Sequence, residues 1–570
     1  METDSDDDKT TDRAKRKEPD DGFEESDRDK RRVCPYLDTV NRKMLDFDFE
    51  KLCSVSLSNL NVYSCLVCGK YFQGRGRTSH AYYHSLQSNH HVFINLHNEK
   101  VYCLPDGYQV EDSSLDDIRN VLNPLFTQPQ IAKLDSLPLY SRSLDGTDYV
   151  PGTIGLNNIK QTDYVNVVVQ ALAHIPLLRN YFLDSENYRN CKSSVVTTFG
   201  ELIRKIWNPT NFKDQVSPHE LLQAVSIASS KRFAIGVQSD PLDFLSWFLN
   251  TLHKDLGGTR KRDSSIIYQV FQGEVEITTE RPDKEKIKAM ALDIRDGEDL
   301  QIDHTELPVV TSKEKSPFLF LALDLPPPPL FKDSQERNII PQIALFTLLN
   351  KFDGVTWTDL PVTRERKQYC ITRLPRYLLL HIKRFTRNNF FVEKNPTIVN
   401  FPVKNLELKD YTSGGEKDVV PLGADGQPLS TKYDLLANIY HEGKPTSGVY
   451  KSHVLHKANE QWYELQDLNI SETMPQIVAL SEALIQVYEC KGASAPSSVP
   501  SLPKPHSTET ETSLVPALPQ SDVSKPAKSL KKKKKKKAGG VAVPKGSGAN
   551  GQAQTQAPSN GTTAMTDTGT

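Results

Sequence analysis

The chain has 570 residues, enough for two or three domains, and 37% of them are apolar, which supports at least one sizeable core. Its charges nearly balance, at a formal net charge of −2. No run of 18 apolar residues occurs and the N-terminus is charged, which argues against a membrane span and a secretory signal. Eight cysteines are too few for a disulfide scaffold. Five of them fall between residues 34 and 103 and indicate a metal site in a reducing compartment.

Residues 1–33 are highly charged and contain almost no apolar side chains. A segment of this composition cannot bury a core, so we expect it to be disordered. Two basic clusters within it, Lys15–Lys17 and Lys30–Arg32, are either nuclear import signals or parts of a solvated tail.

Residues 34–108 form a unit rich in cysteine, histidine and aromatic residues. Cys65 and Cys68 make a CxxC pair, His84 follows 16 residues after Cys68, and His90 lies 6 residues further on. Two thiolates and two imidazoles are the ligand set of a closed, tetrahedral structural zinc site. A small unit with little apolar core needs such a cross-link. The spacing therefore predicts one structural zinc ion bound by these four residues.

This unit resembles the zinc-finger ubiquitin-binding domain of several deubiquitinases, through CPYL at its start, CGKYFQGRG, and SHAYYHSLQSNHH. Members of that family hold one to three zinc ions, and only one ligand set is complete here. Two cysteines of a second set are absent, at Ser56 and near Gln73. The incomplete sets favour buried thiols and a core histidine over further metal ligands. The residues in question are Cys34, Cys53, His80 and Cys103.

In that family an arginine and several aromatic side chains clasp the C-terminal Gly-Gly of ubiquitin. Arg75 lies near the position of the matching arginine, whereas the aromatic set around Tyr102, Leu104 and Tyr108 departs from the family pattern. The resemblance therefore implies two alternatives for this module, weak ubiquitin binding and the docking of another protein.

Residues 109–147 are predicted to form a short helix near 115–125 and then a polar linker, and residues 148–490 a globular domain. Helical periodicity predicts four helices, over 163–182, 198–207, 217–229 and 240–255. β-branched and aromatic residues predict strands that include 377–382, 435–440 and 484–488. Helices that come first and strands that follow predict an α+β domain.

Four stretches of this domain resemble the ubiquitin-specific proteases. They are GLNNIKQTDYVNVVVQALAHI at 155–175, QSDPLDFLSWFL at 238–249, LPRYLLLHIKRF at 374–385, and a last group that ends in WYELQD at 462–467. The resemblance implies a papain-like fold with thumb, palm and fingers subdomains. Active members commonly carry two CxxC pairs in the fingers. No cysteine lies between Cys191 and Cys370, so we expect no thiolate zinc site there.

Cleavage of an isopeptide bond in this family needs a thiolate, an imidazole base, an orienting side chain and a donor to the oxyanion. By resemblance, these positions hold Asp163, Val449, Gln466 and Asn158, so the triad is replaced and only the oxyanion-type asparagine is kept. Asp163 also stands at the start of a predicted helix, where a short acceptor can cap free N–H groups. His453 would lie about 13 Å along a strand from Val449, too far to replace the base. We therefore predict an inactive homologue.

Both domains in this order resemble a family of inactive, ubiquitin-specific-protease-like proteins associated with the spliceosomal tri-snRNP. CPYLDTVNRKMLDFDFEKLC at 34–53 and WYELQDL at 462–468 carry much of this match. The resemblance implies a nuclear, non-catalytic scaffold in pre-mRNA splicing, with spliceosomal snRNP proteins as partners. The alternatives are a ubiquitin-binding adaptor and a residual ubiquitin thiolesterase.

Residues 491–570 are rich in Ser, Pro, Thr, Gly, Ala and Lys, and we expect them to be disordered. Lys531–Lys537 are seven consecutive lysines. Such a block binds polyanions by releasing counterions, so it is an RNA-binding segment, an import signal, both, or a solubilising tail.

Overall fold

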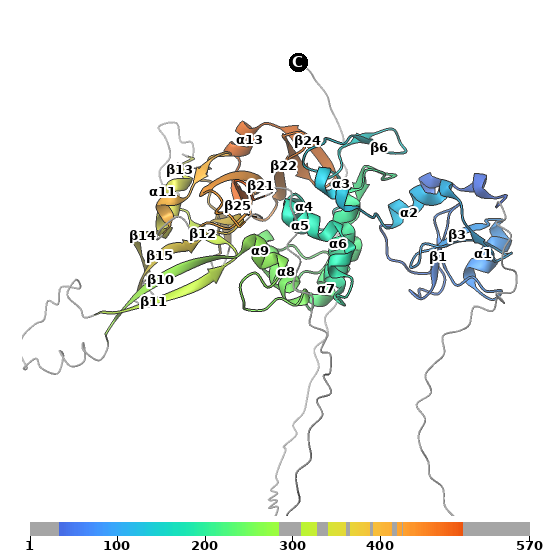
Figure 1. Ribbon diagram of the computed structural model, residues 1–570, viewed down its shortest axis with the longest axis horizontal. Helices are drawn as coiled ribbons and strands as arrows, with labels where there is room; N and C mark the ends of the chain where they lie inside the picture. Colours follow the sequence, from blue (N-terminus) through green and yellow to red (C-terminus); the bar gives the residue numbers. More distant parts are fainter. Residues whose placement is uncertain are drawn as a thin grey trace, which may run out of the picture. The chain divides into compact units, whose positions relative to one another are not determined.

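The structure is a computed structural model that describes residues 34–283, 309–327, 340–360, 365–387, 391–412, 419–423 and 426–493 (Figure 1). The N-terminal segment 1–33 and the lysine run Lys531–Lys537 lie outside these described residues, so the expectations for them stay predictions. No helix among the described residues is long and apolar enough to cross a membrane.

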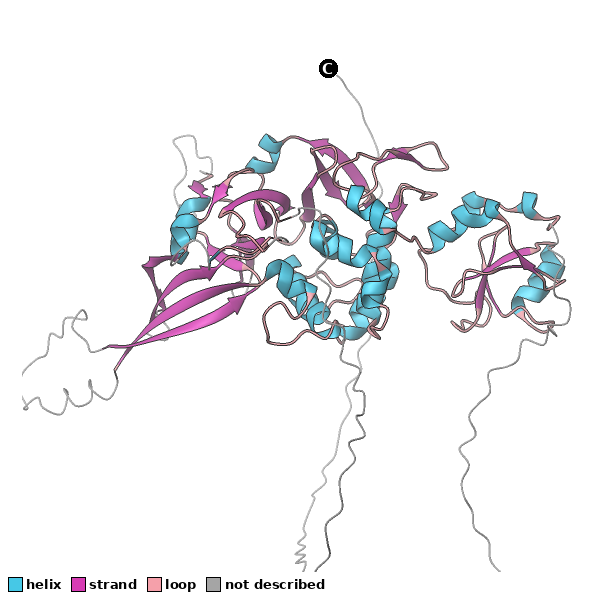
Figure 2. Ribbon diagram, viewed as in Figure 1, coloured by secondary structure: helices cyan, strands magenta, loops and turns pink. Residues whose placement is uncertain are grey.

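The Cys/His-rich unit contains a five-stranded antiparallel sheet in the order β2-β1-β3-β4-β5 and one helix, α1 (Figure 2). The elements are β1 (Val62–Cys65), β2 (Tyr71–Gln73), α1 (His80–Ser88), β3 (Val92–Asn95), β4 (Val101–Cys103) and β5 (Gln109–Val110). Ser79 caps α1, because its hydroxyl accepts a hydrogen bond from the Tyr82 N–H. The helix expected near 115–125 is α2 (Asp116–Leu122), and a second one, α3 (Gln128–Lys133), follows.

Six helices then form the thumb, of which α9 was not predicted and the other five fall in the four segments predicted as helical. They are α4 (Asp163–Ala173), α5 (Pro176–Leu183), α6 (Ser194–Trp207), α7 (His219–Ala228), α8 (Pro241–Asp255) and α9 (Ile266–Phe271). The single helix expected over 163–182 is wrong in one respect, because it is broken before Pro176. Proline has no N–H to continue a helix and restricts the residue before it, and Ile175 is extended, with ψ of 108°.

The strands form two main sheets, which confirms the expected α+β architecture. The palm sheet has eight strands, in the order β12-β16-β25-β21-β22-β23-β24 with β20 paired to β21. Its strands are β12 (Leu321–Asp324), β16 (Tyr377–Lys383), β20 (Leu406–Glu407), β21 (Lys432–Glu442), β22 (Val449–His456), β23 (Gln461–Gln466), β24 (Asn469–Thr473) and β25 (Ala483–Cys490). The finger sheet is antiparallel, in the order β11-β10-β15-β14, from β10 (Gly273–Pro282), β11 (Val309–Phe318), β14 (Asp353–Leu360) and β15 (Glu365–Arg373).

Shorter elements connect these parts. The two-stranded pairs are β6 (Ser141–Arg142) with β7 (Asp148–Tyr149), β8 (Gly155–Leu156) with β9 (Gln215–Val216), β13 (Gln342–Ala344) with β19 (Ile398–Asn400), and β17 (Phe385–Arg387) with β18 (Val392–Lys394). Two short helices, α11 (Leu345–Leu349) and α13 (Pro475–Leu480), complete the described elements.

The helix α4 lies at the centre of the domain, between the other thumb helices and the palm sheet (Figure 1). All of its residues are buried, and it packs against β22 and α8. Its aromatic residue Tyr164 lies against Phe233 and Phe244. The start of α4 is therefore held in place from several sides, and the predicted nucleophile position lies there.

An acidic segment at 46–50, before the zinc unit's sheet, contacts basic side chains of the thumb. The pairs are Asp46 with Lys213, Asp48 with Lys205, and Glu50 with His219. Lys205 is buried, and its Nζ also donates to the carbonyl of Phe47. Burial alone would lower the pKa of Lys205, but Asp48 and nearby glutamates outweigh it and raise that pKa. A buried ion pair of this kind is costly to break, because the remaining charge would stay buried.

Candidate zinc centre and replaced protease triad

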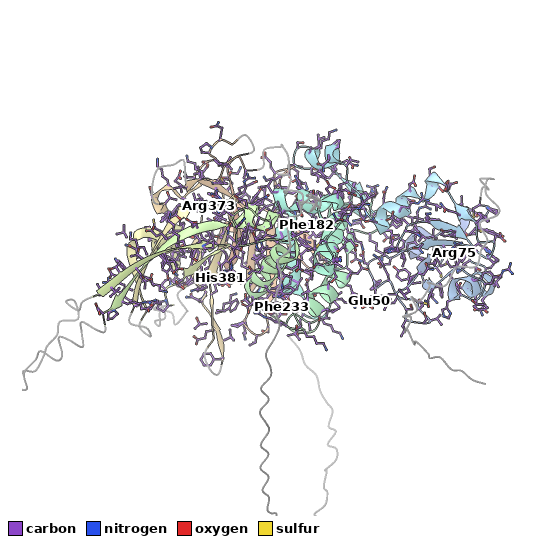
Figure 3. The ribbon with its side chains drawn as sticks, turned by 60° about the horizontal axis from the view of Figure 1, so that its bottom comes forward. Glu50, Arg75, Phe182, Phe233, Arg373 and His381 are labelled. Atoms are coloured by element: carbon purple, nitrogen blue, oxygen red, sulfur yellow. The ribbon has the colours of Figure 1, made fainter. Side chains whose placement is uncertain are left out.

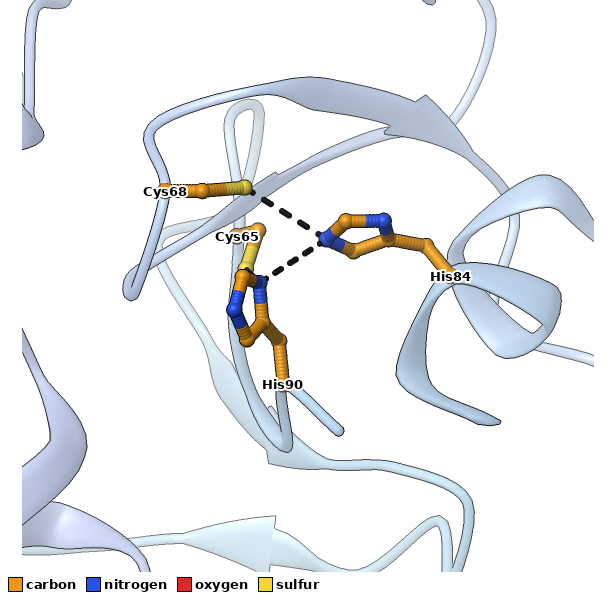
Figure 4. Close-up of side chains that lie close together, drawn as sticks. All are labelled: Cys65, Cys68, His84 and His90. Carbon is orange, nitrogen blue, oxygen red and sulfur yellow. Dashed lines mark hydrogen bonds between the residues drawn. The ribbon is translucent and has the colours of Figure 1, made fainter. Parts of the chain in front are cut away.

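The four residues of the predicted zinc site lie together in the structure (Figure 4). Their ligand atoms all lie within 4.8 Å of one another. Sγ of Cys65 lies 3.5 Å from Nδ1 of His90, and Sγ of Cys68 lies 3.4 Å from Nε2 of His84. The two imidazole nitrogens are 3.1 Å apart. Tetrahedral zinc with bonds of about 2.0–2.3 Å separates its ligands by roughly 3.3–3.8 Å, so this donor set fits zinc.

The chain geometry around the CxxC pair explains why these ligands converge. The N–H of Gly69 donates to the carbonyl of Cys65 and closes the turn. Gly69 has φ of +73°, and a Cβ there would meet the Met44 carbonyl oxygen at 2.0 Å, so the turn requires glycine. On the other side, the ring of His84 stacks on Phe72 at 4.2 Å. The turn and this stacking hold the thiols and imidazoles on facing elements.

The second ligand set expected from the family is replaced by hydrogen bonds. The Cys53 sulfur accepts from the backbone N–H groups of Val55 and Ser56, at 3.5 and 3.4 Å. The Ser56 hydroxyl donates to Oε1 of Gln73 at 2.8 Å. Ser56 and Gln73, the two positions without a cysteine, are thus joined by a hydrogen bond.

The remaining candidates separate into buried thiols and an accessible histidine. Cys34, Cys53 and Cys103 are all buried, as expected. The interpretation of His80 as a core residue is wrong, because it begins α1 and is only half-buried. Among the described residues, the cluster at Cys65 is the one that meets the geometric requirement for a bound metal.

Arg75, which by resemblance lies near the position of the family's ubiquitin-clasping arginine, is labelled in Figure 3, and its guanidinium lies over an aromatic ring. Its guanidinium carbon is 4.4 Å from the ring centre of Tyr102, and Nη1 donates to the Gly107 carbonyl at 3.5 Å. The arginine–aromatic pair is therefore present, although Leu104 is buried and the neighbouring residues differ from the family pattern.

Asp163 holds α4 to the palm. It is the first residue of α4, it is buried, and its Oδ2 accepts a hydrogen bond from the Tyr450 N–H on β22 at 3.1 Å. The expectation that Asp163 caps its own helix is wrong. Thr162 occupies the cap position, and from the first helical position the Asp163 side chain points to β22. A carboxylate held in this way is a poor nucleophile.

The retained asparagine is bound to a neighbouring carboxylate. Asn158 Nδ2 donates to Oδ2 of Asp467 at 3.0 Å, and Asn166 Nδ2 donates to Oδ1 of the same residue at 2.8 Å. Oδ1 of Asn158 accepts from the Thr162 N–H at 3.0 Å. Burial and the nearby Asp163 raise the pKa of Asp467, against the lowering effect of the two asparagines. In this arrangement the Asn158 amide donates to a protein carboxylate.

The backbone reinforces this contact. The N–H of Leu156 donates to the Asp467 carbonyl at 2.9 Å. A Cβ on Gly155 would lie 3.0 Å from the Cα of Leu468, so glycine permits the close approach. The sequence reasoning missed Asp467 as a structural residue. A carboxylate at the end of the WYELQD motif, beside a replaced triad position, was the available signal.

The two other replaced positions lie beside these contacts. Val449 is the first residue of β22, next to Tyr450, and Gln466 is the last residue of β23, next to Asp467. Tyr450 contacts Asp163, and Asp467 contacts Asn158, so the structure brings the four predicted positions to one place. Neither valine nor glutamine can take up a proton near neutral pH.

The nearby histidines have other partners. His453 is buried, stacks on Tyr440 at 4.6 Å, and contacts Oε2 of Glu464 through Nε2 at 3.3 Å. Side chains alternate along β22, so His453 lies on the face opposite Tyr450 and Val454, which pack in the core. His441 packs against Phe385 and Tyr450, and burial, with Lys394, lowers its pKa to about 4. His456 contacts the Pro151 carbonyl through Nε2 at 3.1 Å.

Comparison with known proteins agrees with this geometry. Residues 154–488 match the family described as ubiquitin carboxyl-terminal hydrolase, and residues 53–115 match the zinc finger in ubiquitin hydrolases and other proteins. This chain belongs to the ubiquitin carboxyl-terminal hydrolase family. The resemblance inferred from the sequence motifs is thereby confirmed, with the zinc-finger module ahead of the hydrolase domain.

Several members of the family are similar over most of the chain. The human protein named ubiquitin carboxyl-terminal hydrolase 39 is 53% identical over 467 residues, covering 80% of each chain. The Saccharomyces cerevisiae pre-mRNA-splicing factor SAD1 is 30% identical, covering 80% of this chain and 93% of its own. A crystal structure of an essential yeast splicing factor matches with a TM-score of 0.60 and 28% identity, covering 80% of this chain and 99% of that one.

We expect the purified chain to contain one zinc ion, bound by the cluster at Cys65, and Cys65→Ser to lose it, because a hydroxyl is a weak zinc ligand. The control is Cys53→Ser, which removes a buried thiol outside the cluster and should retain the metal. Elemental analysis of both variants checks this. Two or more zinc ions per chain, or a Cys65→Ser protein that keeps its zinc, would contradict the assignment.

We expect Glu464 to make folding stability depend on pH. Hydrogen bonds, first from His453 and then from Tyr440, lower its pKa to about 2 against the opposing effect of burial. The folded-state pKa lies below the ordinary value of about 4.3. The ionised form therefore stabilises the fold above pH 4.3, and this contribution is lost as the pH falls toward 2. Glu464→Gln should lower the free energy of unfolding at pH 7 by about 1–2 kcal/mol, allowing for the partial exposure of the group.

Urea unfolding at several pH values from 7 to 3 measures this effect. Glu442→Gln is the matched control, since that carboxylate is exposed and also pairs with Lys451. The difference in the free energy of unfolding between the wild type and Glu464→Gln should shrink toward pH 3. Glu442→Gln should stay close to the wild type at every pH. A deficit that is constant across the range would show that the loss comes from packing rather than ionisation.

Proposed function

We propose that this chain is a non-catalytic factor of pre-mRNA splicing, a protein scaffold for assembly or maintenance of the spliceosomal tri-snRNP in the nucleus. Its partners in this proposal are snRNP proteins. The names of its relatives support the splicing role, since the S. cerevisiae relative is a pre-mRNA-splicing factor and a Schizosaccharomyces pombe relative, 45% identical, is named a probable mRNA-splicing protein.

One observation carries the non-catalytic part of the proposal. The Asp163 carboxylate stands where the resemblance puts the nucleophile, and it accepts the Tyr450 N–H. The base position holds Val449, which cannot take the nucleophile's proton or protonate a departing amine. The oxyanion-type amide of Asn158 donates to Asp467. Each group that the chemistry needs is thus absent or engaged in a contact within the fold.

Ubiquitin binding is the second candidate function, and one observation favours it. Arg75 lies over the ring of Tyr102 in the zinc module, and a guanidinium is a residue type that binds carboxylates such as a C-terminus. In this alternative the chain is an adaptor that binds ubiquitin weakly and does not cleave it. Contact of Lys531–Lys537 with RNA would be compatible with either function, although these residues lie outside the described part of the chain.

We expect the tagged full-length chain, purified from nuclear extract, to be enriched in the small nuclear RNAs of the tri-snRNP. A variant with Asp163→Ser that is shown by its thermal transition to be folded should be enriched to the same extent, because a scaffold needs no chemistry at the nucleophile position. Quantitative detection of the small nuclear RNAs after washing measures the enrichment by the wild type and by the variant. Capture of ubiquitin conjugates without small nuclear RNAs would instead favour the adaptor function.

We expect neither the wild type nor Asp163→Cys to release the fluorophore from a ubiquitin C-terminal amide substrate. The introduced thiol would still face Val449, and triad members act as a unit. Removing the acceptor of the Tyr450 N–H should also cost about 1–3 kcal/mol of stability, so a thermal transition must first establish that the variant is folded.

The double variant Asp163→Cys with Val449→His tests how far a base restores the reaction, and Asp163→Ser is the control without a thiol. An active member of the family serves as the positive control. Turnover by the wild type would overturn the non-catalytic proposal. Turnover by Asp163→Cys alone would show that another residue reaches the thiol as a base.

A further inference from the structure

A cavity of about 280 Å³ lies away from both sites, where the finger sheet meets the thumb. It shares no lining residue with the zinc cluster or the replaced triad positions. Arg373, the last residue of β15 and labelled in Figure 3, lines this cavity, and so does Tyr268 on α9. Leu374 and Pro375 add an apolar surface. The cavity is therefore a mixed pocket on a rigid junction of a helix and a sheet.

The charged groups that line this cavity are mostly arginines. Arg262, Arg373 and Arg376 all contribute to the lining, against one carboxylate, Asp263. Asp263 pairs with Arg262 at 3.1 Å. The formal charge of the lining is thus +2. Guanidinium groups form planar, paired hydrogen bonds with phosphate and carboxylate oxygens, which makes this lining suited to an anion.

Two of the arginines are held in place by backbone carbonyls. Arg373 Nη2 donates to the Gln272 carbonyl at 3.1 Å, and Arg376 Nη2 donates to the Leu422 carbonyl at 2.9 Å. Each contact uses one N–H group of a guanidinium that has five. The arginines are therefore positioned before any ligand arrives, which lowers the entropic cost of binding.

The rest of the lining is mixed in character. Polar side chains come from Tyr268, Gln269 and Gln272, and apolar surface comes from Leu374, Pro375 and Pro421. This lining suits a ligand that joins an anionic group to a short chain with polar and apolar parts. A phosphorylated residue in a peptide is such a ligand.

We propose that this cavity binds a phosphorylated serine or threonine in a segment of a partner protein. The phosphate dianion would lie among Arg262, Arg373 and Arg376, and the polar and apolar side chains of the lining would contact the peptide. The cavity gathers three guanidiniums around one small volume, which matches a single doubly charged group. A nucleic-acid strand instead needs an extended track with one charge per nucleotide, so we favour a phosphopeptide. This inference does not depend on the proposed splicing role.

Fluorescence anisotropy with the full-length protein tests the proposal. The probe is a labelled Gly-Ser peptide with one phosphoserine, compared with the same peptide without phosphate. We expect the wild type to bind the phosphorylated probe at least tenfold more tightly. Arg373→Gln with Arg376→Gln should abolish this preference. Arg262→Glu at the exposed rim should also reduce this preference about tenfold, and this second variant spares the two backbone contacts.

Arg142→Gln with Arg189→Gln is the matched control, because it removes the same charge from two exposed arginines elsewhere. This control should keep the preference for the phosphorylated peptide. Because it has the same tail and the same net charge as the double variant at the cavity, it shows how much binding comes from the lysine-rich tail. Equal affinity for the two peptides, or an equal loss in the control, would overturn the proposal. An oligouridine that competes more strongly than the phosphopeptide, through the same arginines, would overturn it in favour of a nucleic-acid site.

Discussion

The hydrogen bond from the Tyr450 N–H to the Asp163 carboxylate joins the thumb helix α4 to the palm strand β22. The helix is buried along its whole length, and a buried carboxylate is tolerated only where donors compensate for its lost hydration. The position that holds the nucleophile in active relatives, by resemblance, thus joins two subdomains here. A hydrolase fold with an aspartate at this position must still accommodate the buried carboxylate, and this contact gives a donor to one of its two oxygens.

Asp467 is a second carboxylate near the start of α4 that accepts hydrogen bonds from other parts of the fold. Two asparagine amides donate to its carboxylate, and the 155–158 loop runs so close to Leu468 that a side chain at Gly155 would have little room. In an active site, amides of this kind donate hydrogen bonds to the oxyanion that develops in the transition state. Here they stabilise a charge that belongs to the protein. The proposed scaffold role therefore agrees with a site whose polar groups serve rigidity.

The zinc module shows a comparable replacement. One Cys/His cluster keeps the geometry of a metal site, while Cys53, Ser56 and Gln73 hold each other by hydrogen bonds. A small sheet of short strands has little folding stability by itself. A single zinc cross-link stabilises such a unit enough only when other packing contributes as well. That support comes from a small buried core and from the acidic segment near Asp48, which pairs with the buried Lys205.

Local patterns in the sequence determined the features that depend on neighbours in the chain. The CxxC turn and the spacing of His84 and His90 predicted the zinc cluster, and periodicity predicted the helices and strands, since both depend on short-range geometry. Tertiary structure alone decided what Asp163 does. Its partner, Tyr450, is 287 residues away, and whether a helix-start carboxylate caps its own helix or bonds to a strand depends on which strand packs there. The arginine cavity is the same kind of feature, because Arg262 and Arg373 lie 111 residues apart and meet only when the finger sheet joins the thumb.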